Sequence, residues 1–171
     1  MSGGPERVDD GRGKYLLVLG LAAAIVVLDQ WTKISVAGSM RLHETRPILP
    51  GFFDLTYVRN TGAAFSMLAG RSAAFRIPFF TLISVLAGAA ILSFVRRTPS
   101  SRKIALVSCA AVLGGAVGNL IDRLLHGEVI DFLSLHWRGF YWPAFNVADS
   151  FITVGVIVLL ARALLGHDDL A

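Results

Sequence analysis

Charged residues are scarce in this chain. They make up 16% of its 171 residues, whereas soluble globular domains carry about 25%. Hydrophobic residues make up 54%, and the mean hydropathy is +0.63. This composition argues against a soluble domain and indicates a membrane protein. The length allows one domain over residues 1–171, in which we expect the first 13 residues to be disordered.

Cysteine is also nearly absent, and the histidines are few. Cys109 is the one cysteine and lies in an apolar run, which excludes an intrachain disulfide. The four histidines are scattered, and none has a metal-ligand spacing to another histidine or to Cys109. Nothing in the sequence therefore indicates zinc.

Basic residues exceed acidic ones, with a formal net charge of +4 and a pI of about 9.7. Such a balance can indicate nucleic-acid binding. Here the lysines and arginines lie at the ends of apolar runs, a distribution that is typical of membrane topology signals. We therefore expect no nucleic-acid partner.

Four apolar runs approach the length of roughly 20 residues that spans a bilayer. They cover about residues 15–37, 72–95, 104–121 and 146–165. The predicted fold class is an all-α membrane protein with four transmembrane helices. A secretion signal is the alternative for the first run, because Lys14 precedes it. That run continues through Asp29 and Lys33, however, and three more runs follow, which favours a transmembrane helix.

The segment VRRTPSSRK between the second and third runs predicts the orientation. It holds four cations, Arg96, Arg97, Arg102 and Lys103. By the positive-inside rule this loop is cytoplasmic, and both termini are then cytoplasmic too. Arginines between residues 38 and 71 weaken this signal but are less densely clustered. In this orientation the distinctive polar residues converge on the outer face: Asp29, Asn60, Asn119, Asp122, Arg123, Asp131, Asn146 and Asp149.

Two outer segments predict further structure. FFDLTYVRN alternates apolar and polar residues, which indicates a short half-buried strand, with Pro47, Pro50 and Gly51 before it and a turn at NTG after it. DFLSLHWRGFYWPAF is rich in Trp, Tyr and Phe, and Trp and Tyr favour the headgroup level of a bilayer. We expect a small extracytoplasmic β-cradle, with a short loop or helix, resting on the outer leaflet.

Each polar residue also has a purely structural interpretation. Asp29 and Lys33 are spaced i, i+4, so an ion pair within the helix and a substrate contact both remain open. Asn146 could cap the last helix, with Asp149 in its first turn. Asp122 could form an ion pair with the arginine that follows it, or tie two helices together.

Two functions fit ionisable groups at membrane depth, where they are expensive and usually functional. An ion or solute pathway would also need polar groups in the inner half of the membrane, where the second and third runs have few. Hydrolysis by paired carboxylates needs one ionised group as base and one protonated group as acid. Carboxylates gathered at one surface favour hydrolysis. By spacing alone, Asp122 and Asp149 could form the pair, since each follows an asparagine by three residues.

Five motifs occur in order along the chain: DQWTK at 29–33, NTGAAFSML at 60–68, GNLIDR at 118–123, VIDF at 129–132 and FNVADS at 145–150. With the four spans, they resemble the bacterial lipoprotein signal peptidases (signal peptidase II) over nearly the whole chain. The resemblance implies an aspartic endopeptidase of the bacterial inner membrane. Such an enzyme removes the signal peptide from diacylglyceryl-modified prolipoproteins, just before the lipidated cysteine. It also implies a monomer in contact with membrane lipid, no metal or cofactor, and inhibition by globomycin-type cyclic peptides.

The same resemblance assigns roles to the polar residues. The catalytic pair falls on Asp131 and Asp149, and not on the pair that spacing alone offers. The residues that would support this pair or bind substrate are Asp29, Lys33, Asn60, Gly62, Asn119, Asp122, Arg123 and Asn146. Presenilin-like and rhomboid-like enzymes do not fit, because the sequence has no GxGD motif and no evident Ser–His pairing.

Overall fold

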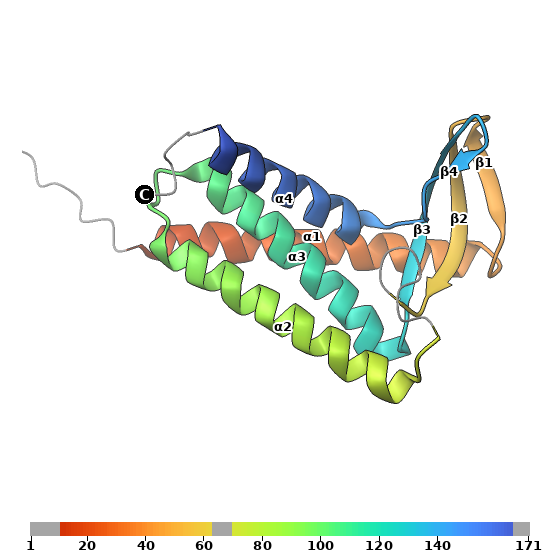
Figure 1. Cartoon of the computed structure of the whole chain (residues 1–171), viewed down its shortest axis with the longest axis horizontal. Coiled ribbons are helices and arrows are strands. Elements are labelled where there is room, and N and C mark those ends of the chain that lie inside the picture. The colour runs from red at the N-terminus through yellow and green to blue at the C-terminus, as the bar shows by residue number, and fades with distance from the viewer. Residues whose placement is uncertain (1–10, 63–69, 166–171) are drawn as a thin grey trace, which may run out of the picture.

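The described part of the chain, residues 11–62 and 70–165 of a computed structural model, folds into four helices and a small sheet. The helices are α1 (Arg12–Ser39), α2 (Ala73–Arg97), α3 (Lys103–His126) and α4 (Val147–Leu164). The strands are β1 (Thr45–Leu49), β2 (Phe53–Asn60), β3 (Val129–Trp137) and β4 (Phe140–Tyr141). The helices form a bundle, and the sheet lies at one end of it (Figure 1).

All four helices are long and apolar enough to cross a membrane, with mean hydropathies between 1.7 and 2.1. The predicted four-span membrane fold is therefore confirmed. α1 already begins at Arg12, so the disorder expected for residues 1–13 does not hold at 12 and 13, and residues 1–10 lie outside the described residues. α3 extends beyond the apolar run 104–121 to His126 and includes Asp122 and Arg123, which the sequence placed at the outer end of this span.

The central helix of the bundle is α3, which is mostly buried, whereas the other three expose most of their length. Small residues allow close approach between helices: a Cβ on Gly114 would lie 2.8 Å from the Ala22 carbonyl oxygen of α1. Likewise, a Cβ on Gly155 of α4 would lie 2.8 Å from the Ser108 carbonyl oxygen. Close packing of small residues is a main source of helix association in lipid. It leaves the large apolar side chains of α1, α2 and α4 on the outside of the bundle.

The antiparallel sheet has the strand order β1-β2-β3-β4. β2 is the half-buried strand predicted from FFDLTYVRN. Pro47, Pro50 and Gly51 precede this strand, as predicted, and Pro47 itself lies within β1, a further strand that was not predicted. β1 is an exposed edge strand, where proline is tolerated. Residues 63–69, which hold most of the motif NTGAAFSML, lie outside the described residues.

The sheet is joined to the bundle by a small apolar core. Tyr57 of β2 and Ile130 and Phe132 of β3 pack with Val36 and Met40 at the end of α1. This contact fixes β3 over the ends of the helices, so that polar side chains on β3 can meet polar side chains on α3 and α4.

Candidate active site

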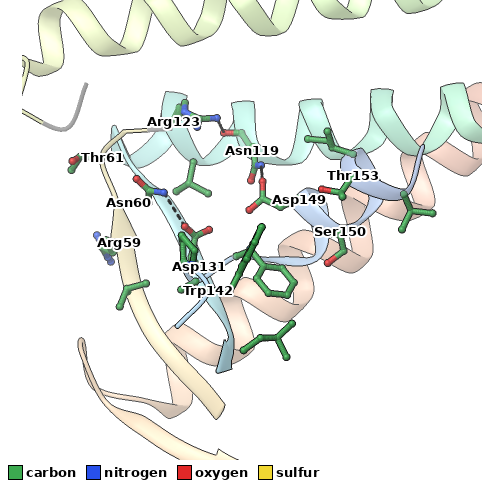
Figure 2. A pocket seen from close by; sticks show the side chains of 18 residues that line it. Arg59, Asn60, Thr61, Asn119, Arg123, Asp131, Trp142, Asp149, Ser150 and Thr153 are labelled. Carbon is green, nitrogen blue, oxygen red and sulfur yellow. Dashed lines mark hydrogen bonds between the residues drawn. The ribbon is translucent and has the colours of Figure 1, made fainter. Parts of the chain in front are cut away.

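The polar residues singled out in the sequence come together near the sheet. Figure 2 shows Asn60, Asn119, Arg123, Asp131 and Asp149 of this group. They come from α1, the end of β2 and the turn after it, the last turns of α3, the start of β3 and the first turn of α4. Hydrogen bonds and ion pairs connect Asp29, Lys33, Asn60, Gly62, Asn119, Asp122, Arg123, Asp131, Asn146 and Asp149.

Asn146 connects the two carboxylates of Asp131 and Asp149. Its side-chain amide donates to Oδ1 of Asp131 at 2.8 Å, and its backbone N–H donates to Oδ2 of Asp149 at 3.3 Å. Its side-chain oxygen accepts from the backbone N–H of Asp149 at 2.9 Å. Asn146 is thus the N-cap of α4 in a reciprocal capping box. The capping interpretation of Asn146 is confirmed. The same residue also holds the carboxylates of Asp131 and Asp149 close to each other.

A second amide holds each carboxylate. Asn60 Nδ2, at the end of β2, donates to Oδ2 of Asp131 at 3.1 Å. Asn119 Nδ2, on α3, donates to Oδ1 of Asp149 at 2.7 Å. Each aspartate therefore accepts from two donors, and each keeps lone pairs that can face a water or a substrate.

A buried cation lies behind these amides. Lys33 Nζ lies 2.8 Å from Oδ2 of Asp29 and 3.0 Å from Oδ2 of Asp122. The ion pair considered for Asp29 and Lys33 is thereby confirmed. Asp122 ties α3 to α1, as one of its two interpretations proposed. Its Oδ2 also accepts from the backbone N–H of Ile130 at 3.1 Å, next to Asp131.

The orientation of the Asn119 amide follows from its neighbours. Its Oδ1 accepts from Lys33 Nζ at 2.9 Å and from Asn146 Nδ2 at 3.1 Å. Two donors facing Oδ1 leave the NH₂ group to face Asp149, which can only accept when ionised. The charge of Lys33 therefore sets the direction of the hydrogen bond to Asp149.

Sequence reasoning missed Gln30, which lies within the motif DQWTK. Its Nε2 donates to Oδ1 of Asp122 at 2.9 Å and lies 3.1 Å from the Gly118 carbonyl oxygen and 3.2 Å from Oδ2 of Asp29. The signal was present in the sequence, because an amide is unusual in an apolar run that spans a membrane. Gln30 thus adds a second polar side chain of α1, beside Lys33, that binds α3.

Arg123 lies beside the site, on the last turn of α3. Its guanidinium carbon lies 4.5 Å from the ring centroid of Phe80 on α2, within the range of a cation–π contact. Its Nη1 and Nη2 donate, at 3.4 Å each, to the carbonyl oxygens of Asn119 and Gly62. Arg123 thus connects α3 to the turn that follows Asn60.

Burial and charge shift the acidity of Asp131. Its side chain is 2% exposed. Burial, and then the nearby charge of Asp149, raise the pKa of Asp131 to about 7, against the opposing effect of hydrogen bonds from Asn60 and Asn146. A carboxyl group with a pKa near 7 exchanges its proton readily at neutral pH, which suits acid–base chemistry.

The two carboxylates open into one cavity of about 1040 Å³. Asp131, Asp149, Asn60, Asn119 and Arg123 line it, together with apolar side chains of β2, β3 and α4 (Figure 2). Asp122 does not line this cavity, and its oxygens face Lys33, Gln30 and the backbone. The pair that spacing alone offered, Asp122 and Asp149, is therefore not the pair that faces the cavity.

Comparison with known proteins identifies the family. Residues 21–165 match the Signal peptidase (SPase) II family. The lipoprotein signal peptidase of Syntrophotalea carbinolica is 46% identical over 147 residues, which cover 86% of this chain and 90% of that protein. The lipoprotein signal peptidase of Geobacter metallireducens is 48% identical over 145 residues, covering 85% and 88%. A solved structure of a bacterial membrane enzyme has a TM-score of 0.80 and 32% identity, covering 90% of each chain.

Four membrane-spanning helices with buried carboxylates beside one cavity define a multi-pass membrane protein that has the groups needed for hydrolysis. The chain belongs to the signal peptidase II family. It is therefore a membrane peptidase.

Proposed function

We propose that the protein is an intramembrane aspartic endopeptidase that removes the signal peptide from diacylglyceryl-modified prolipoproteins in the bacterial inner membrane. Cleavage falls on the N-terminal side of the lipidated cysteine. One observation carries the aspartic mechanism: Asn146 hydrogen-bonds to Asp131 and Asp149, and both aspartates line the same cavity. Family membership and the relatives' name support the lipoprotein substrate.

In the proposed reaction one carboxylate is ionised and the other is protonated. The ionised group takes a proton from a water, whose oxygen attacks the scissile carbonyl carbon. The protonated group donates a hydrogen bond to the carbonyl oxygen as negative charge develops there. When the C–N bond breaks, a proton passes to the leaving amine, which is the amino group of the lipidated cysteine. The two aspartates titrate as a pair, so the shared proton belongs to both.

The supporting residues keep this pair in place. Asn60, Asn119 and Asn146 direct amide N–H groups at the carboxylates. Behind them, Lys33 forms ion pairs with both Asp29 and Asp122. Such fixed donors lower the reorganisation needed when charge moves between the two carboxylates during the reaction.

Lipid supplies much of the substrate recognition in this proposal. The described residues outside the helices form only a small sheet and short turns, which offer little surface for binding a soluble peptide. Each buried CH₂ of an acyl chain contributes about 0.8 kcal/mol to membrane anchoring, so two chains hold the cysteine at headgroup depth. The scissile bond would then lie beside the aspartate pair without a separate peptide-binding domain.

The test is incubation of the purified protein with a prolipoprotein that carries diacylglyceryl, followed by gel shift and mass spectrometry of the product. We expect a product that begins at the lipidated cysteine, formed at least about tenfold faster than from the same prolipoprotein without lipid. Equal rates on the two substrates would contradict the role of the lipid while leaving the peptidase itself in place.

A chelator arm of the same assay tests the metal-free mechanism. Among residues 11–62 and 70–165, no group of three or more His, Cys, Asp and Glu is arranged to hold a metal ion. We expect EDTA to leave the rate unchanged. Inhibition by EDTA that zinc or magnesium reverses would point to a metallopeptidase.

The remaining parts of the proposal concern the state of the protein in the membrane. We expect a monomer with cytoplasmic termini and a site at the outer face. We also expect globomycin-type cyclic peptides to compete with substrate for the cavity. The surface of the cavity is mainly apolar, with polar groups such as Asn60, Asn119 and Asp131 in its lining, which suits a lipophilic cyclic peptide with backbone amides.

A further inference from the structure

Arg76 is a buried cation near the start of α2. Its exposed fraction is 9%. Its Nε donates to the carbonyl oxygen of Arg71 at 2.9 Å, and its Nη1 donates to the carbonyl oxygen of Thr61. The chain has no aspartate or glutamate between Asp54 and Asp122, so no acidic residue near it in sequence accounts for this charge. A buried arginine in a membrane protein is costly and usually serves a function.

The carbonyl that Arg76 holds belongs to the turn that follows β2. Within this turn, Oδ1 of Asn60 accepts from the backbone N–H of Gly62 at 2.9 Å. Because this bond occupies the oxygen of the amide, the NH₂ group of Asn60 is directed at Asp131, to which it donates at 3.1 Å. The conformation of residues 60–62 therefore decides whether Asn60 can donate to the aspartate.

Arginines from two different helices hold this turn. Arg76 of α2 binds the carbonyl of Thr61, and Arg123 of α3 lies 3.4 Å from the carbonyl of Gly62. Figure 2 shows Asn60 at the end of β2, pointing toward Asp131. The turn is thus fixed to both α2 and α3.

We propose that Arg76 is a positioning residue for the peptidase reaction, which acts by holding the Thr61 carbonyl so that Asn60 donates to Asp131. This inference rests on the proposed function, in which Asp131 is one of the reacting carboxylates. Arg76 itself does not line the cavity. It acts on the reaction only through the turn at residues 60–62.

A positioning role has a consequence that simple stabilisation of the fold lacks. The hydrogen bond from Asn60 favours the ionised form of Asp131 and lowers its pKa. When the turn shifts and this bond weakens, the pKa of Asp131 rises further. The limb of the pH–rate profile that Asp131 governs then moves to higher pH. Loss of fold stability alone lowers the amount of active protein without moving the profile.

The test is a double-mutant cycle of Arg76→Gln and Asn60→Ala, with kcat measured on lipidated prolipoprotein across pH. We expect each single variant to lower kcat by about tenfold, the effect of losing one hydrogen bond to a charged group. In the Asn60→Ala background, we expect Arg76→Gln to lower kcat by less than about threefold more, because residues that act through one interaction are not additive. Additive tenfold losses would overturn the proposal. So would a pH–rate profile of Arg76→Gln whose limb lies at the same pH as in the wild type.

Two further variants complete the design. Arg71→Gln removes a charge from an exposed side chain five residues earlier and should leave kcat and the profile unchanged. If Arg76→Gln does not fold, the cycle is repeated with Arg76→Lys, which keeps the charge but lacks the planar fork that reaches two carbonyls. Non-additive losses and a shifted pH–rate profile are again the results that support the proposal. Retained activity in Asp131→Asn would instead show that the proposed catalytic pair is wrong, a result that the cycle alone does not give.

Discussion

The carboxylate of Asp29 accepts a hydrogen bond of 2.9 Å from the backbone N–H of Ala148, across 119 residues of chain. Asp29 lies in the middle of α1, and Ala148 lies in the first turn of α4, beside Asp149. The bond satisfies an N–H at the start of a helix, where no backbone acceptor is available. A charged residue inside one transmembrane helix thus fixes the end of another helix that carries a proposed catalytic carboxylate.

Replacing Lys33 with methionine should strongly destabilise the protein. The side chain is 1% exposed and lies between Asp29 and Asp122, so the variant leaves two buried carboxylates without their cation. Removing one partner of a buried ion pair costs about 3–5 kcal/mol of folding stability. The loss of stability is measured by thermal unfolding in detergent. The matched control is Arg46→Met, which removes an exposed ion pair with Glu44 and should cost less than about 1 kcal/mol. Similar losses in both variants would contradict the proposed importance of the buried pair.

Adding one methyl group at Gly115 should loosen the packing of α3 on α4. A Cβ there would collide with the carbonyl oxygen of Ala148 and approach Cγ1 of Ile152 to 2.7 Å. Overpacking of this kind costs about 1–3 kcal/mol, so Gly115→Ala should lower the unfolding temperature. In Gly20→Ala the added Cβ meets nothing within 4 Å, and the variant should be neutral or slightly more stable. A Gly115→Ala protein as stable as Gly20→Ala would show that the helices pack differently.

The raised pKa of Asp131 predicts a pH dependence of stability. In the unfolded chain this carboxyl has its ordinary pKa of 3.8, and in the fold its pKa is about 7. Between these values the folded state binds more protons, so this group makes the protein less stable as pH rises from about 4 to 7. Asp131→Asn removes the effect. The unfolding temperature of wild type relative to this variant should therefore fall over that range. A constant difference would contradict the raised pKa.

Accessibility to an impermeant thiol reagent tests the orientation in the membrane. Ser101 lies between α2 and α3, and Ile48 lies on the exposed edge strand β1, at the opposite end of the bundle (Figure 1). With Cys109 replaced, single cysteines are introduced at each position. In intact spheroplasts we expect labelling at position 48 and protection at position 101. The reverse pattern would place the aspartate pair at the cytoplasmic face.

The four helices could be predicted from the sequence because a bilayer imposes its own thickness on an apolar run. The partners of charged residues at the helix ends were less predictable. The sequence placed Asp122 and Arg123 at the outer end of the third span but did not give their partners: Asp122 pairs with Lys33, and Arg123 lies over Phe80. Composition cannot show that a charge will meet a partner from another helix.

The residues of the candidate site could be predicted from the sequence, but the hydrogen-bond and ion-pair partners of each residue could not. Asp122 and Arg123 are neighbours in sequence, yet adjacent positions on a helix point in different directions. Asp122 instead pairs with a lysine of α1. The contributions of Gln30 and Arg76 were missed because they depend on carbonyl and carboxylate oxygens that only the folded chain brings near. The family resemblance, and not spacing, singled out Asp131.

The most direct test of the proposed mechanism is the rate of signal-peptide release by Asp131→Asn and by Asp149→Asn. Asparagine keeps the size of the side chain and removes its ability to exchange a proton. Asp54→Asn, on β2, is the matched control, because it makes the same change in a sheet residue that does not line the cavity. All three proteins are purified, checked for folding by thermal unfolding and given the same lipidated prolipoprotein.

The account predicts that Asp131→Asn and Asp149→Asn both fold but release signal peptide about 10²–10⁴-fold more slowly than wild type, the usual contribution of general acid–base catalysis. Asp54→Asn should release it at close to the wild-type rate. A folded Asp131→Asn or Asp149→Asn protein that releases signal peptide at a near-normal rate would contradict it.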